Sequence, residues 1–189
     1  MLFRSALASL LAGDGHEVTL LYTYVGEGKP VCGDRPWSHW VETLAQEGIE
    51  LAHIAHEGPH RAWRQAAWTV MEFLGARDFD IVYFNEHLGG GYYAQLARRE
   101  GLPEFRRQTH CVITHGSIDW IFDINDRYVE FISDVEWMGL ERRSFELADV
   151  VISPSAYLLR EYERRGWRLP ARTYRQPYPV IRKAAVDWN

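Results

Sequence analysis

Hydrophobic and polar positions recur along the chain with two different periods, one typical of helices and one typical of strands. Between 60 and 74, apolar residues return every three or four positions, with Ala66, Val70 and Leu74 on one stripe, which predicts an amphipathic helix. Cys111–Thr114 is instead a short continuous apolar run, the pattern of a strand buried on both faces. The same criteria predict helices at 2–11, 36–46, 60–74, 92–99, 134–147 and 156–165, strands at 18–24, 49–54, 80–84, 111–114, 150–152 and 173–175, and weak helicity within 117–133.

This order of elements predicts the fold class. Strands that alternate with helices of this length form βαβ units, so we expect an α/β, Rossmann-like, mostly parallel sheet with helices on both faces. We expect a single domain over 1–180, with 181–189 as the start of a linker. The chain opens on a helix where such a domain begins with a strand, so we expect that its first strand is lacking and that it is a piece of a larger architecture. An exposed sheet edge would favour a homodimer.

Composition and charge exclude several classes of protein. Hydrophobic residues make up 47% and charged residues 25% of the chain, which is typical of a globular protein. The net charge of −5 argues against binding to nucleic acid. No stretch reaches the ~18 apolar residues of a membrane span, so we expect a cytoplasmic protein, with peripheral membrane association as the alternative. Cys32 in a predicted loop and Cys111 in a predicted strand favour neither a disulfide nor a cysteine metal site.

Candidate chemistry gathers where the predicted strands end. The segments 85–91, 115–120 and 153–155 each follow a strand, and the carboxyl ends of parallel strands share the edge at which open sheets bind ligands. His115 is the strongest candidate, because an imidazole there can contact a substrate hydroxyl or a developing charge. The alternative is a histidine bonded to the backbone in a turn. For Ser155 we expect an architectural role as a helix N-cap.

Two further groups of residues belong to the same predicted edge. In Asn85–Gly91, backbone N–H groups of three consecutive glycines could hold a phosphate or a sugar hydroxyl, and two polar side chains could bind hydroxyls; the alternative is a tight turn. The candidate binding residues from both loops are Glu86, His87, Gly89, Gly90, Gly91, Gly116, Asp119 and Trp120. Asp119 could instead be a helix-start acid and Trp120 a core residue. The histidines and acids lack short metal-ligand spacing, so we expect no metal.

Four runs in order along the chain resemble the N-terminal domain of a GT-B fold glycosyltransferase of the retaining family 4 (group 1) type. They are Leu10–Leu20, Asp78–Tyr83, Val112–Gly116 and, with Glu141 before it, Ala148–Ser155. The resemblance implies transfer of a sugar from a nucleotide-sugar donor to a carbohydrate or lipid-linked acceptor, with no cofactor. It implies that the N-terminal domain holds the acceptor and a C-terminal domain the nucleotide, and that His115 reaches the donor sugar near the bond that breaks.

The resemblance also sets the alternatives. The family's opening strand would precede Leu2, and its donor-binding domain would follow Asn189. Neither is matched by this sequence, so we expect the chain alone to be inactive as a transferase. A non-catalytic binding module of the same fold is the main rival. A nucleotide-sugar epimerase-like GT-B protein and a metal hydrolase are further alternatives.

Overall fold

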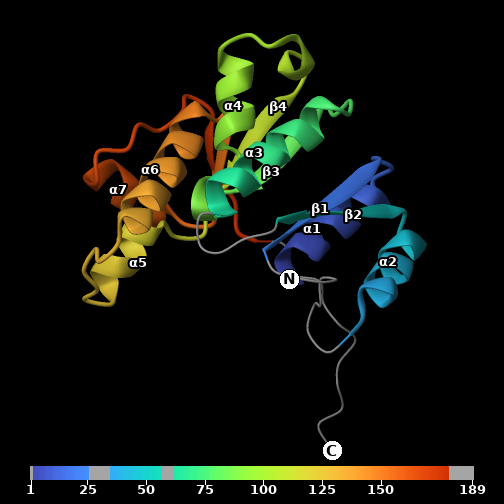
Figure 1. The fold of residues 1–189 in the computed structure, drawn as a ribbon, viewed down its shortest axis with the longest axis horizontal. Helices are drawn as coiled ribbons and strands as arrows, with labels where there is room; N and C mark the ends of the chain where they lie inside the picture. Colours follow the sequence, from blue (N-terminus) through green and yellow to red (C-terminus); the bar gives the residue numbers. More distant parts are fainter. Residues whose placement is uncertain (1, 26–34, 57–61, 179–189) are drawn as a thin grey trace, which may run out of the picture. The chain divides into compact units, whose positions relative to one another are not determined.

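The computed structural model describes residues 2–25, 35–56 and 62–178 of the chain (Figure 1). Its contacts divide the chain into two compact units, one made of residues 1–55 with 178–189 and the other of residues 56–177. The order of helices and strands is the predicted one, which confirms the α/β, Rossmann-like fold class. Most of the predicted loop at 25–35, the first residues of the predicted helix at 60–74 and the predicted linker at 181–189 lie outside the described residues.

The first unit contains two helices and two strands: α1 (Leu2–Gly13), β1 (Val18–Val25), α2 (Trp37–Gln46) and β2 (Ile49–His56). The two strands pair into a sheet of their own. Ala8, Leu44 and Ile49 form its buried core, with partly buried side chains of β1 and β2 packed against it. Each element thus buries one apolar face, as the hydrophobic pattern predicted.

The second unit is built on a four-stranded sheet in the order β3-β4-β5-β6. Its strands are β3 (Ile81–Asn85), β4 (Thr109–Ile113), β5 (Val150–Ser153) and β6 (Thr173–Arg175), and all neighbouring pairs are parallel. Cys111, Val112 and Ile113 of β4 are all buried, and because successive side chains of a strand point to opposite faces of the sheet, both faces are covered here. The pattern of a strand buried on both faces is therefore confirmed, but the single sheet expected from the sequence is divided into two among the described residues.

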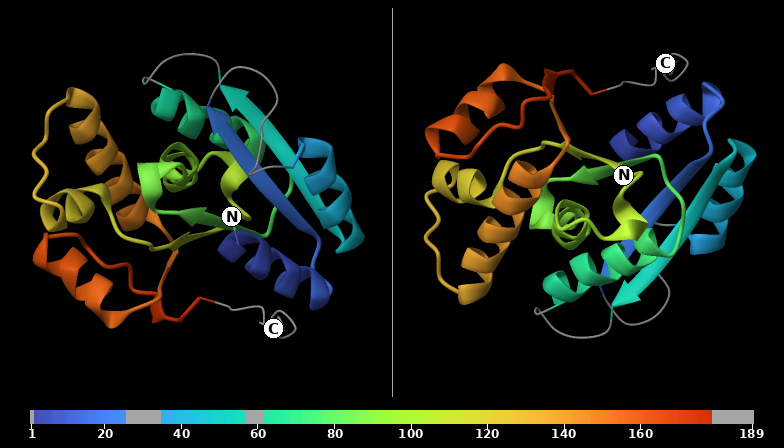
Figure 2. Two further views of the ribbon diagram at one scale, coloured as in Figure 1. Left: turned by 90° about the horizontal axis from the view of Figure 1, so that it is seen from below. Right: turned by 90° about the horizontal axis from the view of Figure 1, so that it is seen from above.

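The helices of the second unit are α3 (Ala62–Gly75), α4 (Tyr92–Arg99), α5 (Ile118–Ile124), α6 (Ile132–Leu147) and α7 (Ala156–Arg164). Two 3₁₀ turns, His87–Gly89 and Pro103–Phe105, lie within its loops. The long helix α6 packs against α4, against α5 and against the turn His87–Gly89, and α3 packs against α4 (Figures 1 and 2). Through the contact between α6 and that turn, a helix far along the chain reaches the loop that follows β3.

Candidate functional site

Strands β3 and β4 end side by side. Asn85 is paired with Ile113 in the register of these strands, so the segments that begin at Glu86 and at Thr114 leave the sheet at the same edge. Strand β5 ends beside β4, where the N–H group of Thr114 donates to the carbonyl of Ile152 at 2.9 Å. The structure therefore brings together the loops in which the sequence placed the candidate chemistry.

Glu86 is the centre of this edge, and it is completely buried. Its Oε1 accepts a hydrogen bond from the N–H group of Gly116 at 2.5 Å, and the Tyr162 hydroxyl donates to the same carboxylate at 2.7 Å. The sequence suggested that Glu86 contacts a substrate directly. The structure places it beneath the surface instead, where it holds the loop that carries His115.

Glu141, on α6, is a second carboxylate that is completely buried. Its Oε1 accepts a hydrogen bond from the N–H group of Leu88 at 2.8 Å, and its Oε2 accepts one from the N–H group of Ile118 at 2.7 Å. A single side chain thus joins the loop after β3 to the start of α5. Together Glu86 and Glu141 accept from the N–H groups of Leu88, Gly116 and Ile118, which would otherwise be costly to bury.

Tyr162, on α7, completes this group of buried side chains. It is fully buried, and its ring stacks on Trp167 with centroids 4.9 Å apart and lies 5.0 Å from Phe145. Packing on two sides fixes the ring, so its hydroxyl is held in place as a donor to Glu86. We call Glu86, Glu141 and Tyr162 the buried acid network.

The network holds its protons unusually tightly. Burial raises the pKa of Glu86 to about 7, although the hydrogen bonds from Tyr162 and Gly116 act in the opposite direction. Burial also raises the pKa of Glu141 to about 8, and the negative charges of Glu86 and Asp119 add to that rise. The pKa of the Tyr162 hydroxyl is raised by burial and by the neighbouring Glu86 carboxylate. Near neutral pH the two carboxyl groups therefore retain protons that exposed glutamates would have lost.

His115 precedes Gly116 in the chain and is exposed. Its Nδ1 lies 3.2 Å from the carbonyl oxygen of Ile113, and a carbonyl can only accept, so Nδ1 carries the hydrogen in this bond. In the neutral ring Nε2 is then the basic nitrogen, which is the arrangement that a proton acceptor needs. The histidine is thus bonded to the backbone, as in one of the two alternatives drawn from the sequence, and it is also exposed to solvent.

The three consecutive glycines have different surroundings. Gly89 has a φ of +61°, and a Cβ there would lie 2.4 Å from the backbone carbon of Leu140. A Cβ on Gly91 would lie 2.7 Å from the Phe84 ring, whereas nothing lies within 4 Å of one on Gly90. Two of the glycines therefore permit close packing, and only Gly90 has open space beside it.

Gly116 and Trp120 form one local structure. Gly116 has a φ of +127°, and a Cβ there would lie 2.8 Å from the Trp120 ring. The indole N–H group of Trp120 donates to the Tyr157 hydroxyl at 3.3 Å, and the rings of Trp120 and Tyr157 meet edge to face. Trp120 is half-buried, so it packs on the loop and still presents part of its ring to solvent.

The other two candidate side chains lie at the margin of the network. Asp119 accepts hydrogen bonds from the Ser117 hydroxyl and, at 2.7 Å, from the N–H group of Trp120. It therefore acts as the helix-start acid that the sequence offered as the alternative. His87 is exposed, and its Nδ1 lies 3.7 Å from Oε1 of Glu141.

Sequence reasoning did not single out Glu141 or Tyr162 as site residues. A signal was present for Glu141, because it lies four residues after Trp137 and three before Ser144, on the face of the helix that the apolar pattern predicted to be buried. A charged residue on a buried helix face needs partners, and here the partners are backbone N–H groups of two loops. Tyr162 similarly follows Leu158 by four residues on the buried face of α7.

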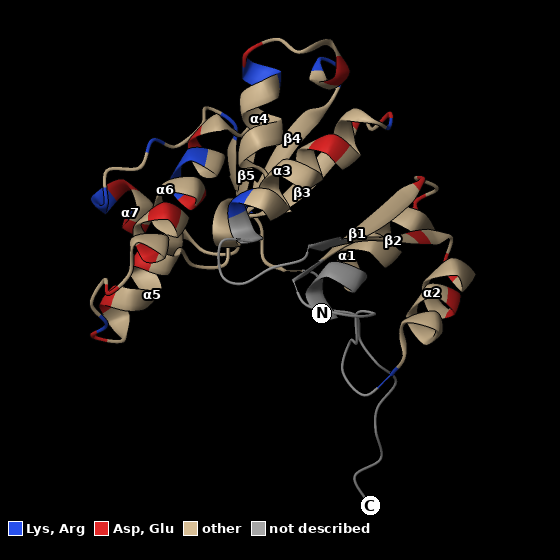
Figure 3. Ribbon diagram, in the orientation of Figure 1, with Lys and Arg blue, Asp and Glu red and all other residues tan. Residues whose placement is uncertain are grey.

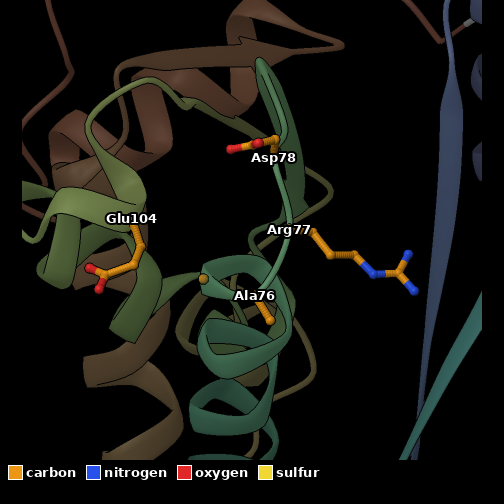
Figure 4. A pocket seen from close by; sticks show the side chains of 5 residues that line it. Ala76, Arg77, Asp78 and Glu104 are labelled. Carbon is orange, nitrogen blue, oxygen red and sulfur yellow. The ribbon is translucent and has the colours of Figure 1, made fainter.

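A shallow pocket lies at the opposite edge of the sheet. Gly75, Ala76, Arg77, Asp78 and Glu104 line a hollow of about 240 Å³ at the turn from α3 into β3, the length of a strand away from Glu86. In Figure 4, Arg77 points away from Asp78 and Glu104. The residues that the structure describes contain no group of three or more histidine, cysteine, aspartate or glutamate side chains placed to hold a metal ion.

A parallel sheet whose carboxyl-edge loops carry the candidate chemistry defines the chain as an α/β domain of the Rossmann-like class. The model of the glycosyl transferase 4-like domain matches residues 4–176, so the chain belongs to that glycosyltransferase family. No curated protein sequence matches the chain. None of the helices in the described part of the chain combines the length and the apolar character needed to cross a membrane.

Proposed function

We propose that this chain is the acceptor-side domain of a glycosyltransferase that moves a sugar from a nucleotide-sugar to a hydroxyl of a carbohydrate or lipid-linked acceptor, without a metal. The observation that carries the proposal is the exposed His115 at the carboxyl edge of a parallel sheet, on a loop fixed from below by Glu86. Membership of the glycosyl transferase 4-like domain family supports it.

We assign the donor diphosphate to a separate C-terminal domain. A diphosphate is bound by backbone N–H groups and cationic side chains. The N–H groups of Leu88, Gly116 and Ile118 already donate to Glu86 or Glu141. Arginines and acidic residues occur together on α6 and α7 (Figure 3), and Nη2 of Arg165, just after α7, lies 2.5 Å from Oδ2 of Asp123. These contacts favour an acceptor or a neutral sugar here over a phosphate group.

Within the site we assign His115 to the donor sugar, close to the bond that breaks. Three further candidates have exposed atoms or open space beside them: His87 and Gly90 in the first loop, and Trp120 in the second. A half-exposed indole suits stacking on a sugar ring. The remaining candidates stabilise the conformation of the two loops; they are Glu86, Gly89, Gly91, Gly116 and Asp119.

The test is a transfer assay with a panel of UDP-, GDP- and ADP-sugars, on the protein encoded by the complete gene and in parallel on the 189-residue chain. We expect turnover with one donor class for the complete protein and negligible turnover for the 189-residue chain. Turnover by that chain alone would contradict the division into acceptor and donor domains. Binding of a sugar without turnover by the complete protein would favour the binding module.

A further inference from the structure

Two buried carboxylates in the second unit meet backbone groups from several separate segments, and one of them, Glu86, is bonded to the N–H group of Gly116, the residue after His115. Glu86 follows β3, Tyr162 belongs to α7 and Glu141 to α6, yet all of their bonds end on the loops after β3 and β4. Side chains that only stabilised a core would not need to converge on the two segments that carry the proposed chemistry.

We propose that Glu86 is a positioning residue for the transfer reaction, which sets the place of His115 through the N–H group of the adjacent Gly116, with Tyr162 holding Glu86 and Glu141 holding the adjoining ends of both loops. This inference rests on the proposed function, because positioning has a catalytic meaning only if His115 meets the substrate.

The geometry gives Glu86 this role. Gly116 adopts a φ of +127°, a conformation that residues other than glycine rarely adopt, and its N–H group points to Glu86 at 2.5 Å. On its other side, Nδ1 of His115 is bonded to the carbonyl of Ile113, the last residue of β4. The imidazole is thus fixed between a strand end and a turn whose shape depends on one buried carboxylate. A displacement of about 1 Å in such a group costs about 10²-fold in rate.

Protonation is part of this arrangement. The titratable groups that face the two carboxyl groups are Tyr162 from α7, Asp119 from α5 and His87 from the first loop. Glu86 and Glu141 also act on each other. Burial raises the pKa of Glu86 to about 7, so its ionisation falls in the range in which enzymes are assayed. An ionised Glu86 accepts hydrogen bonds from N–H groups more strongly than the neutral acid does, so the loop is held more firmly above that pH.

Asp134 offers a matched control on the same helix as Glu141. It is buried, and its Oδ2 accepts hydrogen bonds from the N–H groups of Glu130 and Phe131 at 3.2 and 3.1 Å. It therefore resembles Glu86 in being a buried carboxylate on backbone N–H groups, but its bonds are made at the start of α6 and not to the loop of His115. A purely structural role predicts the same behaviour for both residues.

The experiment compares Glu86→Ala, Glu86→Gln, Tyr162→Phe and Asp134→Ala in the protein encoded by the complete gene. Hydrogen–deuterium exchange of the peptide that spans 114–118 reports the mobility of the loop, and kcat and KM are measured across pH.

We expect Glu86→Ala to speed exchange in this peptide and to lower kcat about 10²-fold with a small change in KM. Glu86→Gln, which keeps one acceptor oxygen but cannot ionise, should restore part of kcat and remove the step near the pKa of Glu86 from the pH profile. Asp134→Ala should change neither exchange at 114–118 nor kcat.

Equal effects of Glu86→Ala and Asp134→Ala on exchange and kcat would overturn the positioning role, as would faster exchange at 114–118 with an unchanged kcat. If Glu86→Ala does not fold, the same comparison is made with Glu86→Gln and Tyr162→Phe. If the wild-type protein turns over no donor, the proposed function fails, and the exchange data still decide whether Glu86 holds the loop.

Discussion

Gly89 and Gly90 are adjacent in the sequence, but their surroundings differ sharply. A Cβ on Gly89 would overlap the backbone of α6 at Leu140, while one on Gly90 would meet open space. The two positions therefore separate the packing role of the glycine run from any binding role. Of the three consecutive glycines we propose only Gly90 for ligand contact, because open space lies beside it, and its φ of −56° is one that any residue adopts.

Gly89→Ala should destabilise the protein by about 3 kcal/mol, since overpacking costs about 1–3 kcal/mol and the positive φ adds to it. Gly90→Ala should change the free energy of unfolding by less than about 0.5 kcal/mol. Urea unfolding followed by tryptophan fluorescence measures both variants. Equal stabilities would contradict the close contact between Gly89 and α6.

The helix α7 shows how a local signal in the sequence fixes an element. The Ser155 side chain accepts a hydrogen bond from the N–H group of Leu158 at 3.2 Å, so the predicted N-cap is confirmed. Ser155→Ala should lower the free energy of unfolding by about 1 kcal/mol, and Ser155→Asp should retain most of it, because both serine and aspartate accept from the first turn. A loss of similar size in both variants would mean that the hydroxyl has another role.

The elements and the edge of the sheet could be predicted from the sequence, but the network beneath that edge could not. The continuous apolar run at Cys111–Thr114 and the stripe at Ala66, Val70 and Leu74 are local patterns, and each appears in the structure as a buried strand or helix face. The bond from Leu88 to Glu141 joins residues 53 positions apart, and no periodicity encodes which loop a buried carboxylate will meet. For the same reason Glu86 could be recognised as chemically suitable but not as buried.

The buried acid network also connects the site to the stability of the whole protein. The pKa of Glu86 is raised to about 7 and that of Glu141 to about 8, so the folded state holds protons that the unfolded chain releases near the ordinary glutamate pKa of 4.5. Stability from these groups is thus fully present at low pH and is lost as the pH rises through those two values. His110, whose pKa is lowered to about 4 by burial, acts in the opposite direction but only below its ordinary value of 6.5.

Between pH 6.5 and about 8, the free energy of unfolding should therefore fall as the pH rises, and the fall should be smaller in Glu86→Gln and Glu141→Gln. Urea unfolding at a series of pH values in this window measures the slope. Asp134→Asn is the control, and it should keep the wild-type slope. A stability that rises across the window would contradict the raised pKa values.

The central claim is that a sugar is transferred at the edge of the sheet where His115 stands. The most direct test is the initial rate of transfer by the protein encoded by the complete gene, compared between wild type, His115→Ala and His39→Ala, an exposed histidine of α2 in the other unit. We predict that His115→Ala lowers kcat about 10²-fold or more while the circular dichroism spectrum is unchanged, and that His39→Ala retains the wild-type rate. A His115→Ala protein that is folded and as active as the wild type would contradict the claim.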